Sequence, residues 1–113
     1  MQIVEGAGVW TAPPAGAAND WVENLRVADL SVGTYCIPAG GVDDQGPHTE
    51  AEVYVVTAGR ARIVTPGGAA DVGPGSVIFV PAGEEHRFVD VSEDLALLVV
   101  FGPAYGSRGS TET

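Results

Sequence analysis

Apolar residues along this chain occur in short runs, and many of these runs alternate apolar and polar positions. A period of two is typical of β-strands that bury one face. Clusters of glycine and proline separate the runs and supply the turns between strands. Only residues 15–23 leave room for a short helix. We therefore predict strands at residues 9–10, 21–27, 30–37, 52–57, 61–65, 77–80, 86–91 and 95–101.

Many short strands at close spacing, without a long helical period, predict an all-β sandwich or barrel. A chain of 113 residues has room for one hydrophobic core and thus one domain. We expect residues 1–29 to form strands that flank the barrel and residues 30–102 to form its core. Residues 103–113 are expected to be a frayed C-terminal tail, because the last residues are small and polar.

The charge of the chain limits its partners and its location. Its net charge is −10, from 15 acidic and 5 basic residues, so we expect neither nucleic acid nor an anionic membrane as a partner. No apolar run is long enough to span a bilayer, and the first residues lack the pattern of a secretory signal. The single cysteine, Cys36, excludes an internal disulfide, and the cytoplasm is therefore the expected location.

The two histidines of the chain each lie in a set of residues with the same parity. In a strand, residues of equal parity face the same side. If both sets face the interior, imidazoles, carboxylates and aromatic rings line one cavity, where a carboxylate must be paired or bind a cation. The alternative is that the glutamates face water on an edge strand. One set is His48, Glu50, Glu52, Tyr54 and Val56, and the other is His86, Phe88 and Asp90.

Two motifs resemble those of the cupin family, in particular its small single-domain bacterial members. The first motif has a glycine, two histidines separated by one residue, a glutamate and a second glycine. The second motif has a glycine, a proline, a glycine, a histidine and an asparagine. The chain matches the first motif at Gly40, His48, Glu52 and Gly59, and the second at Gly75, Pro81, Gly83 and His86. Gly46 replaces the first histidine, and Asp90 replaces the asparagine. The resemblance covers about residues 30–101 and implies a single jelly-roll β-barrel of the cupin type.

In metal-binding cupins, the histidines and the glutamate of these motifs hold one divalent ion. The resemblance implies His48, Glu52 and His86 as the ligands here, while Gly46 offers no side chain. Two imidazoles and one carboxylate suit Fe(II), and also Mn, Zn or Ni, and they leave positions open for substrate or dioxygen. The alternative is that the missing histidine disables the site and that no metal binds.

Three further residues are candidates for completing the metal site in place of the missing histidine. Glu50 has the parity of the other candidates, and Asp44 and Gln45 precede the replaced position directly. Each offers an oxygen atom, as a side-chain or main-chain group.

Other residues are expected to shape the pocket. Tyr54, Phe88 and Asp90 are predicted to line it, with Tyr54 also the candidate catalytic general acid. Asp90 either orients an imidazole or is simply a polar residue at a strand end. Trp21 is expected to close the barrel end or to lie at an interface.

Three functions remain open at this point. The first is a metal-dependent enzyme acting on a small organic molecule, with Fe(II) dioxygenase chemistry as the leading variant and isomerase, lyase or cyclase chemistry next. The second is a non-catalytic module that binds or senses a small ligand in a degenerate, metal-free site. The third is a metal-free enzyme with His48 or His86 as general base. The resemblance also implies a homodimer, in which an N-terminal strand pairs with the partner's sheet.

Overall fold

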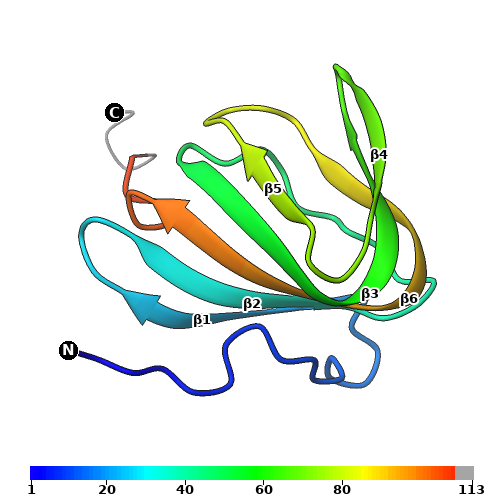
Figure 1. Ribbon diagram of the computed structural model, residues 1–113, viewed down its shortest axis with the longest axis horizontal. Coiled ribbons are helices and arrows are strands. Elements are labelled where there is room, and N and C mark those ends of the chain that lie inside the picture. The colour runs from blue at the N-terminus through cyan, green and yellow to red at the C-terminus, as the bar shows by residue number, and fades with distance from the viewer. Residues whose placement is uncertain (109–113) are drawn as a thin grey trace.

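The computed structural model describes residues 1–108, and this part of the chain contains six strands and no helix (Figure 1). The all-β prediction is therefore confirmed. Residues 15–23, which left room for a short helix, contain none, because β1 begins inside this segment. The strand predicted at residues 9–10 is wrong, because these residues form no strand. The strands are β1 (Asp20–Arg26), β2 (Ser31–Ile37), β3 (Ala51–Thr65), β4 (Gly68–Val72), β5 (Val77–Val80) and β6 (Arg87–Gly102).

One antiparallel sheet joins the strands in the order β1-β2-β6-β3-β4, and β5 pairs with the first part of β3. The long strands β3 and β6 each join two of the predicted strands into one. Their pairing shifts register at three places between Val56 and Arg62, and such bulges bend a sheet. Gly59 lies in this bend with φ of 86°, and a Cβ there would lie 2.1 Å from the carbonyl oxygen of Asp94. The close approach of the two strands thus requires the motif glycine.

The strand β4 was not predicted from the sequence. It contains small residues and follows the Pro66–Gly67 turn, so it lacks the bulky apolar residues that mark a strand. It nevertheless completes a hairpin by pairing with Ala61–Thr65 of β3. The pairing with β3, together with the buried Val72 at the end of the strand, holds this segment extended.

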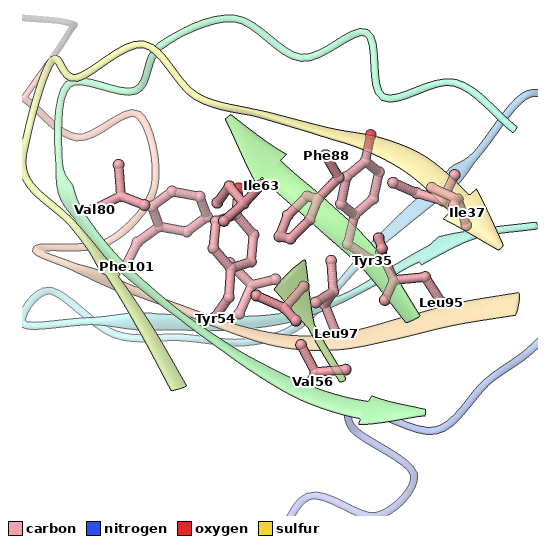
Figure 2. Close-up of a cluster of buried hydrophobic side chains, with 14 residues drawn as sticks. Tyr35, Ile37, Tyr54, Val56, Ile63, Val80, Phe88, Leu95, Leu97 and Phe101 are labelled. Carbon is pink, nitrogen blue, oxygen red and sulfur yellow. The ribbon is translucent and has the colours of Figure 1, made fainter. Parts of the chain in front are cut away.

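The hydrophobic core lies between the inward faces of these strands (Figure 2). On β3, every second side chain from Glu52 to Val56 is buried, which confirms the predicted parity. Tyr54 has no exposed surface, and its ring meets that of Phe88 edge to face at a centroid distance of 5.0 Å. Leu95 and Leu97 of β6 complete the contact between the halves of the sheet. The core therefore fixes the inward side chains of β3, including those at its polar end.

The N-terminal segment follows the outside of the sheet beneath β1 and β2, in blue in Figure 1. Its Gly8 donates a backbone hydrogen bond to Oγ1 of Thr34 on β2, and its carbonyl oxygen accepts one from the hydroxyl of Thr57 on β3. A Cβ at Gly8 would lie 3.1 Å from that of Leu98. The segment thus covers part of the outer face without joining the ladder of strands.

The C-terminal segment turns back toward β3 after β6 ends. Ala104 is 2% exposed, and the backbone N–H groups of Gly106 and Arg108 donate to the Glu50 carboxylate at 2.8 and 3.0 Å. The tail was expected at residues 103–113. Residues 103–108 make the contacts given above, and residues 109–113 lie outside the described residues. Within residues 1–108, no helix is long and apolar enough to cross a membrane.

Candidate metal centre

Three candidate ligands from separate parts of the chain meet at one end of the barrel. His48 lies in the loop before β3, Glu52 near the start of β3, and His86 directly before β6. One ligand atom from each lies within 4.8 Å of the others. Oε1 of Glu52 is 3.2 Å from Nε2 of His86 and 3.9 Å from Nε2 of His48. The chain thus gathers the residues that the two motifs indicate.

Backbone contacts of the second motif hold the two histidines together. The Pro81–Gly83 turn is closed by a hydrogen bond from the N–H of Glu84 to the carbonyl oxygen of Pro81 at 3.2 Å. The N–H of Gly83, which has φ of 79°, donates to the carbonyl oxygen of His48 at 2.7 Å. The turn before His86 is therefore tied directly to the loop that carries His48.

His86 has a fixed ring orientation. Its Nδ1 lies 3.0 Å from the carbonyl oxygen of Glu84, which can only accept, so Nδ1 carries a proton. In the neutral ring, Nε2 then presents its lone pair to the site, where the hydroxyl of Tyr54 lies at 2.8 Å. A carbonyl partner on the far nitrogen is the arrangement that orients metal-binding histidines. Burial lowers the pKa of His86, but the nearby Glu52 carboxylate and the carbonyl oxygen of Glu84 outweigh burial and raise it overall.

Glu52 is the buried group without a satisfied partner. Its exposed fraction is 2%, and within the described residues neither carboxylate oxygen accepts a hydrogen bond. Such a carboxylate costs several kcal/mol to bury unless a positive charge offsets it. The nearest groups that can share a cation with it are the two imidazoles. The unpaired oxygens and the oriented lone pair of His86 therefore fit a bound divalent ion.

His48 is less deeply enclosed than His86. Burial lowers the pKa of His48, and the charge of the Glu52 carboxylate offsets this only in part. Its Nε2 lies 2.7 Å from Oε1 of Gln45. Its ring also packs edge to face against Phe101 and Tyr105, with centroid distances of 5.0 and 5.4 Å. These contacts favour the neutral imidazole, which is the form that binds metals.

Glu50 does not share this site, although it was a candidate ligand. It precedes β3, so strand parity does not govern it, and its carboxylate points to the C-terminal turn. Burial raises the pKa of Glu50, but hydrogen bonds from the Thr49 hydroxyl and from the N–H groups of Gly106 and Arg108 outweigh burial and lower it overall. Glu50 therefore anchors the segment after β6.

The predicted pocket residues separate into three environments. Tyr54 lines the cavity beside the candidate ligands, and Phe88 packs behind it in the core, as Figure 2 shows. Asp90 is exposed on the outside, with φ of 50°, so its expected place in the pocket is wrong. It lies where β6 bulges against β3, and the bulge breaks the parity on which the expectation rested.

Asp43 is the buried aspartate beside the cavity, and it orients Tyr35 and Gln45 rather than an imidazole. It is 2% exposed and accepts hydrogen bonds from the Tyr35 hydroxyl at 2.8 Å, the Phe88 N–H at 2.9 Å and the Gln45 amide at 3.1 Å. Sequence reasoning missed Asp43 because it lies in a loop, where no period applies.

A cavity of about 180 Å³ opens beside the three candidate ligands. Aromatic rings of Trp21, Tyr35, Phe101 and Tyr105 form much of its wall. Trp21 was expected at a barrel end or an interface, yet it lies across Gly33, where a Cβ would come within 2.1 Å of its ring. Its place in the cavity depends on the pairing of β1 with β2, which the sequence pattern does not specify.

Comparison with known proteins identifies the class to which this fold and site belong. The cupin domain matches residues 33–101, which is more than half of the chain. The chain therefore belongs to the cupin family, and the predicted family and jelly-roll fold are confirmed. It is also 48% identical over 89 residues to an uncharacterized protein of Streptomyces coelicolor, a match that covers 77% of this chain and 85% of that protein.

Solved cupin structures resemble the chain at low sequence identity. The DMSP lyase DddQ of Ruegeria pomeroyi has a TM-score of 0.70 and 20% identity, over 90% of this chain and 54% of that one. KdgF of a Halomonas species has a TM-score of 0.70 and 16% identity, over 80% of this chain and 85% of that one. An RmlC-like cupin of Shewanella frigidimarina has a TM-score of 0.69 and 18% identity, over 80% of this chain and 81% of that one. The chain thus spans about half the length of the lyase, and these likenesses show the shared fold.

Proposed function

We propose that this cupin holds one divalent metal ion with His48, Glu52 and His86 and acts on a small organic molecule in the adjacent cavity. The observation that carries the proposal is the Glu52 carboxylate, which is buried without a hydrogen bond and faces two imidazoles. When bound, the ion supplies a Lewis acid with open coordination positions for substrate or dioxygen. Fe(II) dioxygenase chemistry is the leading variant, and metal-assisted isomerase, lyase or cyclase chemistry is the next.

The cavity walls supply the binding surface for the substrate. Its aromatic rings suit an apolar or flat part of a small molecule and exclude water from the reacting end. Among the described residues that line it, the acidic side chains of Asp44 and Glu52 are present, and no lysine or arginine is. The lining therefore favours a neutral or cationic substrate over an anionic one, apart from a group that binds the ion itself.

Tyr54 is the residue we assign to proton transfer. Its hydroxyl lines the cavity and accepts a hydrogen bond from the Gln45 amide at 2.9 Å while facing Nε2 of His86. Burial first, and then the charge of Glu52, raise the pKa of Tyr54 above its ordinary value. The hydroxyl therefore stays protonated at neutral pH, and its position beside the candidate ligands, rather than its pKa, is what favours it as the proton donor.

The second candidate function, a metal-free module that binds a small ligand, has its own support. In the absence of an ion, both Nε2 atoms already have partners, Gln45 for His48 and Tyr54 for His86. The metal-free enzyme, with an imidazole as general base, would use the same contacts. Only the unpaired Glu52 distinguishes the metal-binding proposal from these alternatives on structural grounds.

Elemental analysis of tag-free protein, beside the His48→Ala and His86→Ala variants, tests the proposal. Near-stoichiometric iron, manganese, nickel or zinc that is lost in both variants would support it. Absence of metal after reconstitution would overturn it in favour of the binding module. Turnover that is lost on chelation separates the metal enzyme from a metal-free enzyme, whose activity a chelator leaves unchanged.

The cellular setting is part of the same proposal. We place the protein in the cytoplasm, because its single cysteine is buried and free.

We also propose a homodimer that associates through the outer face of the sheet. There, directly opposite residues form one apolar row across β2, β6, β3 and β5, namely Val32, Val100, Val53 and Phe79. Phe79 is 63% exposed in the single chain.

A further inference from the structure

We infer that the side-chain oxygen Oε1 of Gln45 is a metal ligand, in place of the histidine that Gly46 lacks. This inference rests on the proposed function, because it requires that the site bind an ion. It adds a fourth group to the set of His48, Glu52 and His86, and it changes the donors from two nitrogens and one oxygen to two of each.

The position of Gln45 supports this assignment. The residue directly precedes Gly46, and its Oε1 lies 2.7 Å from Nε2 of His48, one of the three candidate ligands. It is half-buried and lines the cavity together with His48 and Glu52. Gly46 itself has no side chain to offer. A Cβ on Gly46 would meet no atom within 4 Å, so the space beside this residue is open.

The orientation of the Gln45 amide is determined by its neighbours. Its Nε2 donates to Oδ2 of Asp43 at 3.1 Å and to the Tyr54 hydroxyl at 2.9 Å. A carboxylate can only accept, so the amide nitrogen, and not the oxygen, must face Asp43. Asp43 is itself held by the Phe88 N–H and the Tyr35 hydroxyl. Oε1 is consequently turned toward His48 rather than free to rotate.

This orientation places two acceptors opposite each other. A neutral His48 that offers its Nε2 lone pair to an ion would meet the lone pairs of Oε1 at 2.7 Å. Such a pair is favourable only when a proton or a cation lies between the atoms. With an ion present, both atoms become donors to it, and the unpaired Glu52 oxygens gain the same partner. One cation can thus take the place of the proton that the His48–Gln45 pair otherwise needs, and it also gives the Glu52 oxygens a partner.

The choice of ion follows from the chemistry of the donors. Replacing an imidazole nitrogen by a neutral amide oxygen makes the set harder, because carbonyl and carboxylate oxygens suit Mn²⁺ better than they suit softer ions. We therefore expect Gln45 to contribute more to Mn²⁺ binding than to Zn²⁺ binding. A role limited to hydrogen bonding within the loop predicts no such difference between the two ions.

The experiment measures Mn²⁺ and Zn²⁺ dissociation constants by calorimetry with chelator competition, on metal-free full-length protein. Gln45→Met keeps the length of the side chain but has no oxygen, whereas Gln45→Glu keeps an oxygen at the same place. We expect Gln45→Met to weaken Mn²⁺ binding roughly 10- to 100-fold and Zn²⁺ binding less. Gln45→Glu should bind Mn²⁺ at least as tightly as the wild-type protein. Gln2→Met makes the same change at an exposed residue that does not line the cavity, so it is the control and should leave both constants unchanged.

Each result has a separate meaning. Wild-type affinity in Gln45→Met would overturn the inference while leaving the three-ligand site intact. Equal losses in Gln45→Met and Gln45→Glu would also overturn it, because a structural role explains them. Failure of the wild-type protein to bind either ion would overturn the proposed function itself. Thermal unfolding of the metal-free proteins tests whether Gln45→Met has a folding defect. If it unfolds at a lower temperature than the wild-type protein, Gln45→Ala takes its place in the same comparison.

Discussion

The hydroxyl of Tyr54 lies 2.8 Å from Nε2 of His86, the same nitrogen that faces the Glu52 carboxylate at 3.2 Å. A proton donor and an unpaired carboxylate thus converge on one lone pair. The two groups have different proposed roles, because Tyr54 supplies a proton whereas Glu52 supplies a negative charge to an ion. Substitutions at the two residues can therefore test the roles separately.

Tyr54→Phe is expected to reduce turnover while the protein retains its metal. The substitution removes the hydroxyl and leaves the ring, which packs against Phe88. Loss of a general acid typically lowers the rate by about 10²- to 10⁴-fold. Loss of the two hydrogen bonds of the hydroxyl, to Gln45 and His86, should lower the free energy of unfolding by about 1 to 3 kcal/mol. Steady-state kinetics measure turnover, elemental analysis of the same preparation measures the retained metal, and denaturant unfolding measures the free energy. Unchanged turnover would remove Tyr54 from the mechanism.

Glu52→Gln should abolish metal retention and yet stabilise the metal-free protein. The buried carboxylate accepts no hydrogen bond in the described part of the chain, so removal of its charge relieves a desolvation cost. We expect the free energy of unfolding of the metal-free protein to rise by about 1 to 3 kcal/mol at a pH above the raised pKa of His86, where the ring has lost its extra proton. Denaturant unfolding measures it.

Glu52→Ala and His86→Ala extend the test. Each should also lose the metal, with only a modest change in folding. A metal-free Glu52→Gln protein that is less stable than the wild-type protein would show that Glu52 already has a stabilising partner. Full metal occupancy in Glu52→Ala and His86→Ala would show that the ligand set is wrong.

Glu50→Gln should destabilise the fold without changing metal retention. The carboxylate is 1% exposed and accepts two backbone N–H groups of the C-terminal turn. An amide offers one oxygen and turns an N–H₂ group toward those donors, at an expected cost of about 1 to 3 kcal/mol. Denaturant unfolding measures the change. Glu5→Gln makes the same change at an exposed residue, so it is the matched control and should change neither property. Loss of metal in Glu50→Gln would return Glu50 to the list of ligands.

The barrel and the three candidate ligands could be predicted because their signals are local. Alternation on β3 places Glu52 and Tyr54 on the buried face, and the motif spacing brings His86 into the same set. The residues that were missed or misplaced depend on contacts distant in the sequence. Asp43 lies in a loop without a period, and Trp21 reaches the cavity only through the pairing of β1 with β2. Asp90 follows the correct period, but a bulge turns it outward.

The proposed dimer gives the last prediction. The apolar row on the outer face carries no charge on a chain of net charge −10, so two copies can meet there without opposing their acidic residues. Val77 and Phe79 are 68% and 63% exposed, and a second copy would bury them. We expect the wild-type protein to be a dimer by light scattering after gel filtration, and Phe79→Glu to be a monomer with an unchanged fold. Val42→Glu introduces the same charge at an exposed loop residue away from the row and should remain a dimer. A monomeric wild-type protein would contradict the dimer, and a dimeric Phe79→Glu protein would show that association uses another surface.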